Sequence, residues 1–127
     1  MGSYLRLCIV FALAAPVLPA RADMSVRDMA GATDAVRAAA QAIVQYEMCG
    51  VNSSEIISML LDHASECDAS ETQMAKLQST YDQEVSSHKS LLKQQGLQCQ
   101  WSLPQAQAQF NKMKSNLQEK MRSSGCN

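Results

Sequence analysis

The sequence predicts an all-α protein: a small up-and-down bundle of about four helices, cross-linked by two disulfides. After the first 22 residues, the chain has one proline and is rich in alanine, glutamine, serine, methionine and leucine. This composition favours helix over strand. Four cysteines remain in the same region, each at or beside the end of a predicted helix. An even number of cysteines in a short chain is typical of a disulfide framework.

Residues 1–22 have the pattern of a cleaved export signal. Arg6 precedes an apolar stretch at 7–18, and residues 20–22 (Ala-Arg-Ala) match the small-x-small pattern that signal peptidase cuts. The apolar stretch contains Pro16, is followed by Pro19, and is shorter than the roughly 20 residues of a membrane-spanning helix. We therefore expect an exported chain, periplasmic or secreted, that begins at Asp23 and has no membrane span after cleavage.

The rest of the chain, 23–127, is expected to form a single helical domain, with 23–32 as a loosely ordered N-terminal segment. Loss of Arg6 and Arg21 with the signal changes the formal net charge from −1 to −3. This balance does not favour nucleic acid as a partner, because phosphate backbones bind basic surfaces.

The first helix is predicted from an N-cap at about Thr33 to Cys49, with Gly50 supplying the left-handed residue that ends it. Its apolar positions recur at helical spacing: Val36, Ala39, Ile43 and Tyr46.

The second helix is predicted to start at Asn52, because Glu55 three residues later completes a pattern similar to a capping box. Asn52 also begins an Asn-Ser-Ser glycosylation sequon, and we favour the cap. This helix is expected to end near Cys67.

The third helix is predicted to start at Ser70 with Gln73 and to stop at Gly96. The fourth is predicted to start at Ser102 with Gln105 and to end at Gly125. The third helix carries an apolar stripe of Met74, Leu77, Tyr81, Val85, His88 and Leu92, and the fourth one of Ala106, Phe110, Met113, Leu117 and Met121.

These helix ends predict the disulfide pairing. Short connections make successive helices antiparallel, so the ends of the first and third helices share one pole of the bundle, and those of the second and fourth share the other. The pairs are then Cys49–Cys99 and Cys67–Cys126. A Cys67–Cys99 bond would have to bridge the third helix, roughly 37 Å long at 1.5 Å per residue, whereas bonded Cα atoms lie about 6 Å apart.

No catalytic, cofactor or metal residues are assigned. Met59, His63 and Cys67 share one helical face and resemble a soft-metal site for copper, but Cys67 is better used in a disulfide. His88 is interpreted as a partly buried core histidine, with a pH-sensitive interface element as the alternative. The serines lack a G-x-S-x-G context, so we do not expect an enzyme.

A possible interface lies at the junction of the last two helices. Leu97, Trp101 and Leu103 stand there among many glutamines, which gives apolar residues a polar, weakly charged surround. The favoured function is therefore a small, exported, non-enzymatic protein that binds another envelope or secreted protein, as chaperones, secretion accessories, inhibitors and immunity proteins do. The alternative is a ligand- or metal-binding helical carrier, and the third hypothesis is an enzyme with an unrecognised site. A carrier predicts a pocket lined by methionine and histidine, whereas an interaction module predicts an exposed apolar patch.

Overall fold

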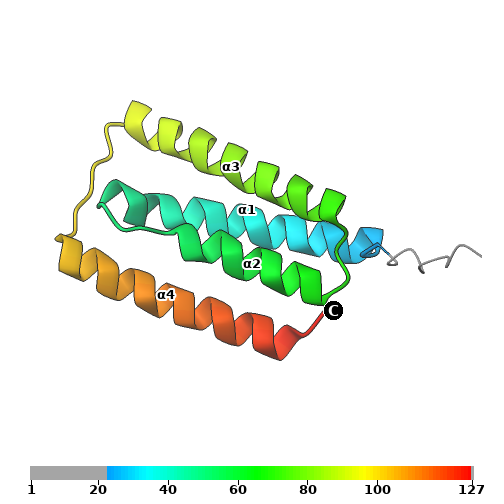
Figure 1. The fold of residues 1–127 in the computed structure, drawn as a ribbon. Coiled ribbons are helices and arrows are strands. Elements are labelled where there is room, and N and C mark those ends of the chain that lie inside the picture. Colours follow the sequence, from blue (N-terminus) through cyan, green and yellow to red (C-terminus); the bar gives the residue numbers. More distant parts are fainter. Residues whose placement is uncertain (1–22, 127) are drawn as a thin grey trace, which may run out of the picture.

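The computed structural model describes residues 23–126, which form four α-helices. Successive helices run in opposite directions, so each pole of the bundle collects one end of every helix (Figure 1). The predicted all-α, up-and-down bundle is confirmed for these residues. The export signal predicted at 1–22 lies outside them. The helices are α1 (Val26–Met48), α2 (Ser54–Glu66), α3 (Glu71–Gln94) and α4 (Leu103–Ser124).

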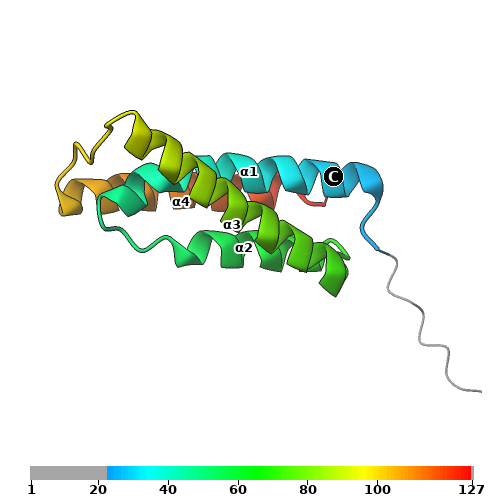
Figure 2. The ribbon, with the colours of Figure 1, turned by 90° about the horizontal axis from the view of Figure 1, so that it is seen from above.

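The pair α1 and α2 occupies the centre of the bundle, with α3 on one side and α4 on the other (Figures 1 and 2). The most extensive packing is between α1 and α3, whereas α3 and α4 do not contact each other. Residues 95–102, which connect α3 to α4, therefore have to cross the pole of the bundle to join its two outer helices (Figure 1). This crossing segment carries Leu97, Cys99 and Trp101.

All four helices contribute to one apolar core. The predicted stripe of α3 is buried at Leu77 and Tyr81 but only half-buried in the second half of the helix, at Val85, His88 and Leu92. No helix within residues 23–126 is long and apolar enough to cross a membrane. The largest fully buried side chains are Phe110, Ile43, Ile56, Leu77, Val36 and Val44.

Three helices end in the same hydrogen-bonded motif. Gly50 follows α1 with φ +88°, and the next N–H, from Val51, donates to the Tyr46 carbonyl at 3.0 Å. The arrangement recurs after α3 at Gly96 and after α2, where Asp68 takes the left-handed conformation at φ 68°. These bonds satisfy carbonyls that the helix leaves unpaired. They also place Cys49 and Cys67 at the C-caps of α1 and α2.

The predicted start of the first helix is wrong, and so is the loose order expected for 23–32. The α1 helix begins at Val26, because the Ser25 side chain accepts a hydrogen bond from the Asp28 N–H at 3.1 Å and caps it. Thr33 lies inside the helix, where its hydroxyl donates to the Met29 carbonyl at 2.8 Å. A threonine that bonds back to the preceding turn needs no cap position.

The predicted capping box at the start of α2 is also wrong. The N-cap residue is Ser53, and the Asn52 side chain instead accepts from the Ser54 N–H at 3.0 Å in a local turn. Ser53 makes no side-chain cap bond, and its hydroxyl donates to the Glu47 carboxylate. Glu55 pairs with Lys114 of α4 at 2.9 Å. Asn52 remains exposed.

The other two predicted capping boxes are confirmed at Ser70–Gln73 and Ser102–Gln105. Gln73 has a further role that the sequence did not indicate. Its side-chain amide donates to the Met24 carbonyl and accepts from the Met24 N–H, both at 2.9 Å, which fixes the segment before α1 against the start of α3.

Both predicted disulfides are confirmed. Cys49 and Cys99 lie at one pole with Cα atoms 5.0 Å apart, and Cys67 and Cys126 lie at the other pole at 5.2 Å. The pairing follows from the alternating helix directions, as expected. Two disulfides in a chain of this size are typical of proteins from oxidising compartments.

Candidate functional site

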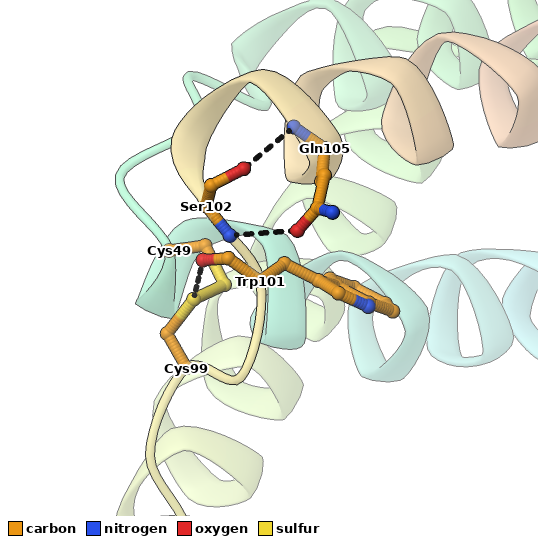
Figure 3. Close-up of a disulfide and its surroundings, with 5 residues drawn as sticks. All are labelled: Cys49, Cys99, Trp101, Ser102 and Gln105. Carbon is orange, nitrogen blue, oxygen red and sulfur yellow. Dashed lines mark hydrogen bonds between the residues drawn. A yellow bond between two sulfur atoms is a disulfide. The ribbon is translucent and has the colours of Figure 1, made fainter.

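The Cys49–Cys99 disulfide attaches the crossing segment to the end of α1 (Figure 3). Cys49 is the C-cap of α1, and Cys99 lies in the middle of the crossing segment. The Cys99 sulfur is 3.0 Å from the Trp101 carbonyl oxygen. A disulfide sulfur carries no proton, so we regard this as a close contact and not as a hydrogen bond. The bond holds this non-helical segment at a defined place on the pole.

Trp101 is fixed from two further directions. Its indole stacks on Tyr46 of α1, with ring centroids 5.5 Å apart and an interplanar angle of 18°. Tyr46 in turn meets Phe110 of α4 edge-on at 5.8 Å. Immediately after the tryptophan, the Ser102 hydroxyl and Gln105 side chain form the reciprocal cap of α4 (Figure 3). The indole is thus a positioned side chain that joins the crossing segment to the core.

Four large apolar side chains are exposed at this pole. Leu97 is 46% exposed, Trp101 37% and Leu103 54%, and Leu91 in the last turns of α3 is 46% exposed. The one other exposed large apolar residue among 23–126 is Val26, at the opposite pole. We call these four residues, Leu91, Leu97, Trp101 and Leu103, the pole surface.

The structure brings all three sequence-predicted interface residues to this pole. Two of them share a cleft, and the third packs beside the turn that follows α1. Leu97 and Trp101 line a shallow cleft of about 260 Å³ beside the Cys49–Cys99 bond. Leu103 lies next to Gly50: if Gly50 had a Cβ atom, that atom would be 3.8 Å from a Leu103 methyl carbon. The surround is polar and weakly charged: Lys93 is exposed in the last turn of α3, among the following exposed glutamines on the crossing segment and adjoining turns: Gln94, Gln95, Gln98, Gln100, Gln105, Gln107 and Gln109.

A polar cluster centred on Glu47 lies where α1, α2 and α3 meet near the same pole. Its carboxylate accepts from the Ser53 hydroxyl and pairs with Lys89 at 2.8 Å. The nearby Tyr81 hydroxyl is buried and has no hydrogen-bond partner. Burial raises the pKa of Tyr81 to about 12; the neighbouring Ser53 hydroxyl opposes the rise, and the charge of Glu47 adds to it. The Ser53 hydroxyl therefore lies close to Tyr81 but donates its hydrogen bond to Glu47.

A second cavity, of about 380 Å³, lies toward the opposite pole, between α1, α2 and α4. Met24, His63 and Met121 are among its lining residues, which is the kind of pocket expected of a carrier. The copper hypothesis loses its thiolate, because Cys67 is in a disulfide, with its sulfur 3.9 Å from His63 Nε2. Across residues 23–126, no three histidine, cysteine or acidic side chains are grouped to hold a metal ion.

Sequence reasoning missed Leu91, the Glu47–Lys89 pair and the second cavity. Leu91 adjoins the predicted stripe residue Leu92, and the helical spacing that places Leu92 on the stripe was a signal that Leu91 faces outward. The Glu47–Lys89 pair joins residues 42 positions apart. A signal for the cavity was present in α1, whose first half is unusually rich in alanine and glycine.

Comparison with known proteins gives no relative: no family model, curated protein or solved structure matches this chain.

Proposed function

We propose that this protein is an exported, non-enzymatic binding module that docks onto another envelope or secreted protein through the pole surface. Roles of this type include chaperones, secretion accessories, inhibitors and immunity proteins. The observation that carries the proposal is that four of the five exposed large apolar side chains of the described residues gather at one pole. Exposed apolar residues scattered singly need no explanation, whereas a cluster with a polar surround is typical of an interaction site.

The rigidity of the crossing segment supports the same proposal. A loop that orders only on binding loses conformational entropy, and this cost reduces affinity. Here the Cys49–Cys99 bond, the Tyr46–Trp101 stack and the Ser102–Gln105 cap hold the segment in place before a partner arrives. A positioned tryptophan that is partly exposed is well suited to anchor a partner, because tryptophan is enriched among the residues that dominate binding energy.

The low charge around the pole surface, where Lys93 is exposed among many glutamines, indicates the chemistry of the partner. The four apolar residues are surrounded by glutamines, which donate and accept hydrogen bonds without imposing a charge. We infer a partner that inserts an apolar side chain into the cleft beside Trp101 and meets the rim through neutral polar groups. Its binding would then depend only weakly on salt, since charge pairs would contribute little.

The test is affinity capture with the oxidised protein from an envelope extract of its own source, at low and high salt. The informative variant is L97S/L103S, because it removes exposed apolar groups and leaves the packed Trp101 in place. Val26→Ser is the matched control, since Val26 is 90% exposed and lies at the other pole. We expect a specific partner that the wild type and V26S retain and L97S/L103S loses. Equal retention by all three proteins, or no specific retention by any, would reject the pole surface as the binding site.

A further inference from the structure

The cleft between the first half of α1 and the second half of α4 exists because α1 presents small side chains there. Gly31, Ala32 and Ala35 line the α1 wall, and a Cβ added at Gly31 would meet nothing within 4 Å. On the facing wall, Leu117 and Met121 of α4 are only partly buried. Protein interiors are normally packed without gaps of this size, so this half of the bundle is hollowed.

The disulfide at this pole fixes the end of α4 relative to the end of α2. Cys126, just beyond α4, is bonded to Cys67 at the end of α2, so the bond holds the end of α4 against α2. Both cysteines line the cleft. The floor is apolar and comes from buried residues of α1, α2 and α3: Val36, Leu60, Ala64 and Leu77.

The size and walls of this cleft fit a hydrocarbon chain. The cleft has a volume of 380 Å³, which is the volume that about a dozen water molecules occupy in liquid water. A methylene group is similar in size to a water molecule, so the cleft has room for a chain of about that many carbons. Water bound against such walls finds few hydrogen-bond partners, so its displacement by an apolar chain is favourable. Binding sites for small molecules commonly have volumes in this range and apolar walls.

The charges on the rim define the head group of the ligand. Arg27 of α1 and Lys120 of α4 line opposite walls and are both exposed. Neither enters a salt bridge within the described part of the chain. Asp28 is the one carboxylate that lines the cleft, so the lining is net positive. We propose that this cleft binds a single-chain amphiphile with an anionic head group, a carboxylate or a phosphate, whose chain lies between α1 and α4.

The binding test is calorimetric titration of the oxidised protein with dodecanoate, kept below its critical micelle concentration. Dodecyl phosphate and dodecyltrimethylammonium are titrated in parallel as anionic and cationic probes with the same chain. We expect saturable binding of one anionic chain per protein, at least tenfold tighter than the cation. The tighter of the two anions identifies carboxylate or phosphate as the natural head group. Absence of saturable binding by both anions, or equal binding of the cation, overturns the proposal.

The position of the bound chain is tested with a matched pair of substitutions at one residue. G31L places a large side chain in the cleft, whereas G31A adds one methyl group and leaves the space open. Both changes replace a helical glycine by a better helix former, so neither is expected to unfold α1. Dodecanoate affinity should fall at least tenfold in G31L and less than threefold in G31A. Equal affinities for the two variants would place the chain elsewhere and overturn the proposal.

The contribution of the rim is tested with R27Q/K120Q, and R37Q/K112Q serves as the charge-matched control outside the cleft. We expect the first pair to weaken dodecanoate about tenfold and the second to change it less than threefold. A general effect of both pairs would mean that net charge and not the rim attracts the anion. L97S/L103S should leave the dodecanoate titration unchanged. The proposal of an amphiphile site and the proposal of binding through the pole surface are therefore tested independently.

Discussion

The side-chain amide of Gln73 and the backbone of Met24 form a closed pair of hydrogen bonds, each 2.9 Å long. The two residues are 49 positions apart in the chain. The same Gln73 oxygen also accepts from the Ser70 N–H at 3.1 Å in the cap of α3. One side chain therefore starts α3 and fixes the segment that precedes α1.

Gln73→Ala should destabilise the protein by about 2 kcal/mol, because it removes a capping interaction and leaves the Met24 backbone groups without partners. The matched control is Gln105→Ala, which disrupts the equivalent cap of α4. That control should cost less than about 1 kcal/mol. Urea denaturation measures both values, and amide hydrogen exchange should show faster opening near residue 24 in Q73A only. Equal losses in the two variants would mean that the bonds to Met24 add nothing.

Tyr81→Phe should stabilise the protein at neutral pH by about 1 kcal/mol, because it removes a buried hydroxyl that has no partner. The two proteins should also differ at high pH. The pKa of Tyr81 is raised from 10.0 to about 12 in the folded state. The folded protein therefore holds this proton more tightly than the unfolded chain, and the resulting contribution to the free energy of unfolding is fully present below pH 10. It is lost as the pH rises toward 12, because the unfolded chain releases the proton first.

The expected loss for the wild type relative to Y81F over this interval is roughly 2 kcal/mol, at 1.36 kcal/mol per pKa unit. Thermal melts at closely spaced pH values, recorded rapidly to limit disulfide exchange, measure the difference. Parallel pH profiles for the two proteins would show that the Tyr81 hydroxyl is solvated in the folded state.

Removal of either disulfide should weaken the fold by a similar amount, because the two loops that they close are of similar length. The bonded pairs are separated by 50 and 59 residues in sequence, which the chain-entropy model converts to roughly 4 kcal/mol for each bond. Small domains are stable by only about 5 to 15 kcal/mol in total. We expect C49S/C99S and C67S/C126S to fold with a reduced Tm and the four-serine variant to unfold or nearly so. A cooperative melt of that variant near the wild-type Tm would contradict this expectation.

The effect of replacing a glycine with alanine should depend on the backbone conformation of that glycine. Gly50 and Gly96 have φ values of +88° and +70°, so alanine at either position should cost about 1 to 2 kcal/mol. Gly31 lies within α1 and has open space around it, so Gly31→Ala should stabilise by up to about 1 kcal/mol. Chemical denaturation of the three single variants gives the comparison, and a loss of stability in G31A would show that α1 requires the glycine.

The features that could be predicted from the sequence are those with a local signal. The caps at Ser70 and Ser102 and the turn at Gly50 depend on residues within one helical turn, so their types and spacing are sufficient. The disulfide pairs followed from these ends and the alternation of helix directions. For the candidate site, the exposure of Leu97 and Trp101 was indicated by the surrounding glutamines.

The features that were missed depend on tertiary contacts. The N-cap residue of α2 is Ser53 and not Asn52, and the Ser53 hydroxyl bonds Glu47 on another helix. The early start of α1 is an exception, because its cap, formed by Ser25 with the Asp28 N–H, is local; Gln73, far along the chain, adds support. The stack of Tyr46 on Trp101 depends on the path of the crossing segment, which follows from the separation of α3 and α4.

The order of the bonded cysteines has a consequence for the maturation of the chain. Along the sequence the bonds interleave, since Cys67 lies between Cys49 and Cys99, and Cys99 lies between Cys67 and Cys126. A chain that enters an oxidising compartment with its N-terminus first exposes Cys49 and Cys67 before either native partner. These two cysteines stand at opposite poles of the finished bundle, so an early bond between them must be exchanged through a mixed disulfide before α2 can complete its helix. Efficient maturation therefore favours slow oxidation or an isomerase acting on the new chain.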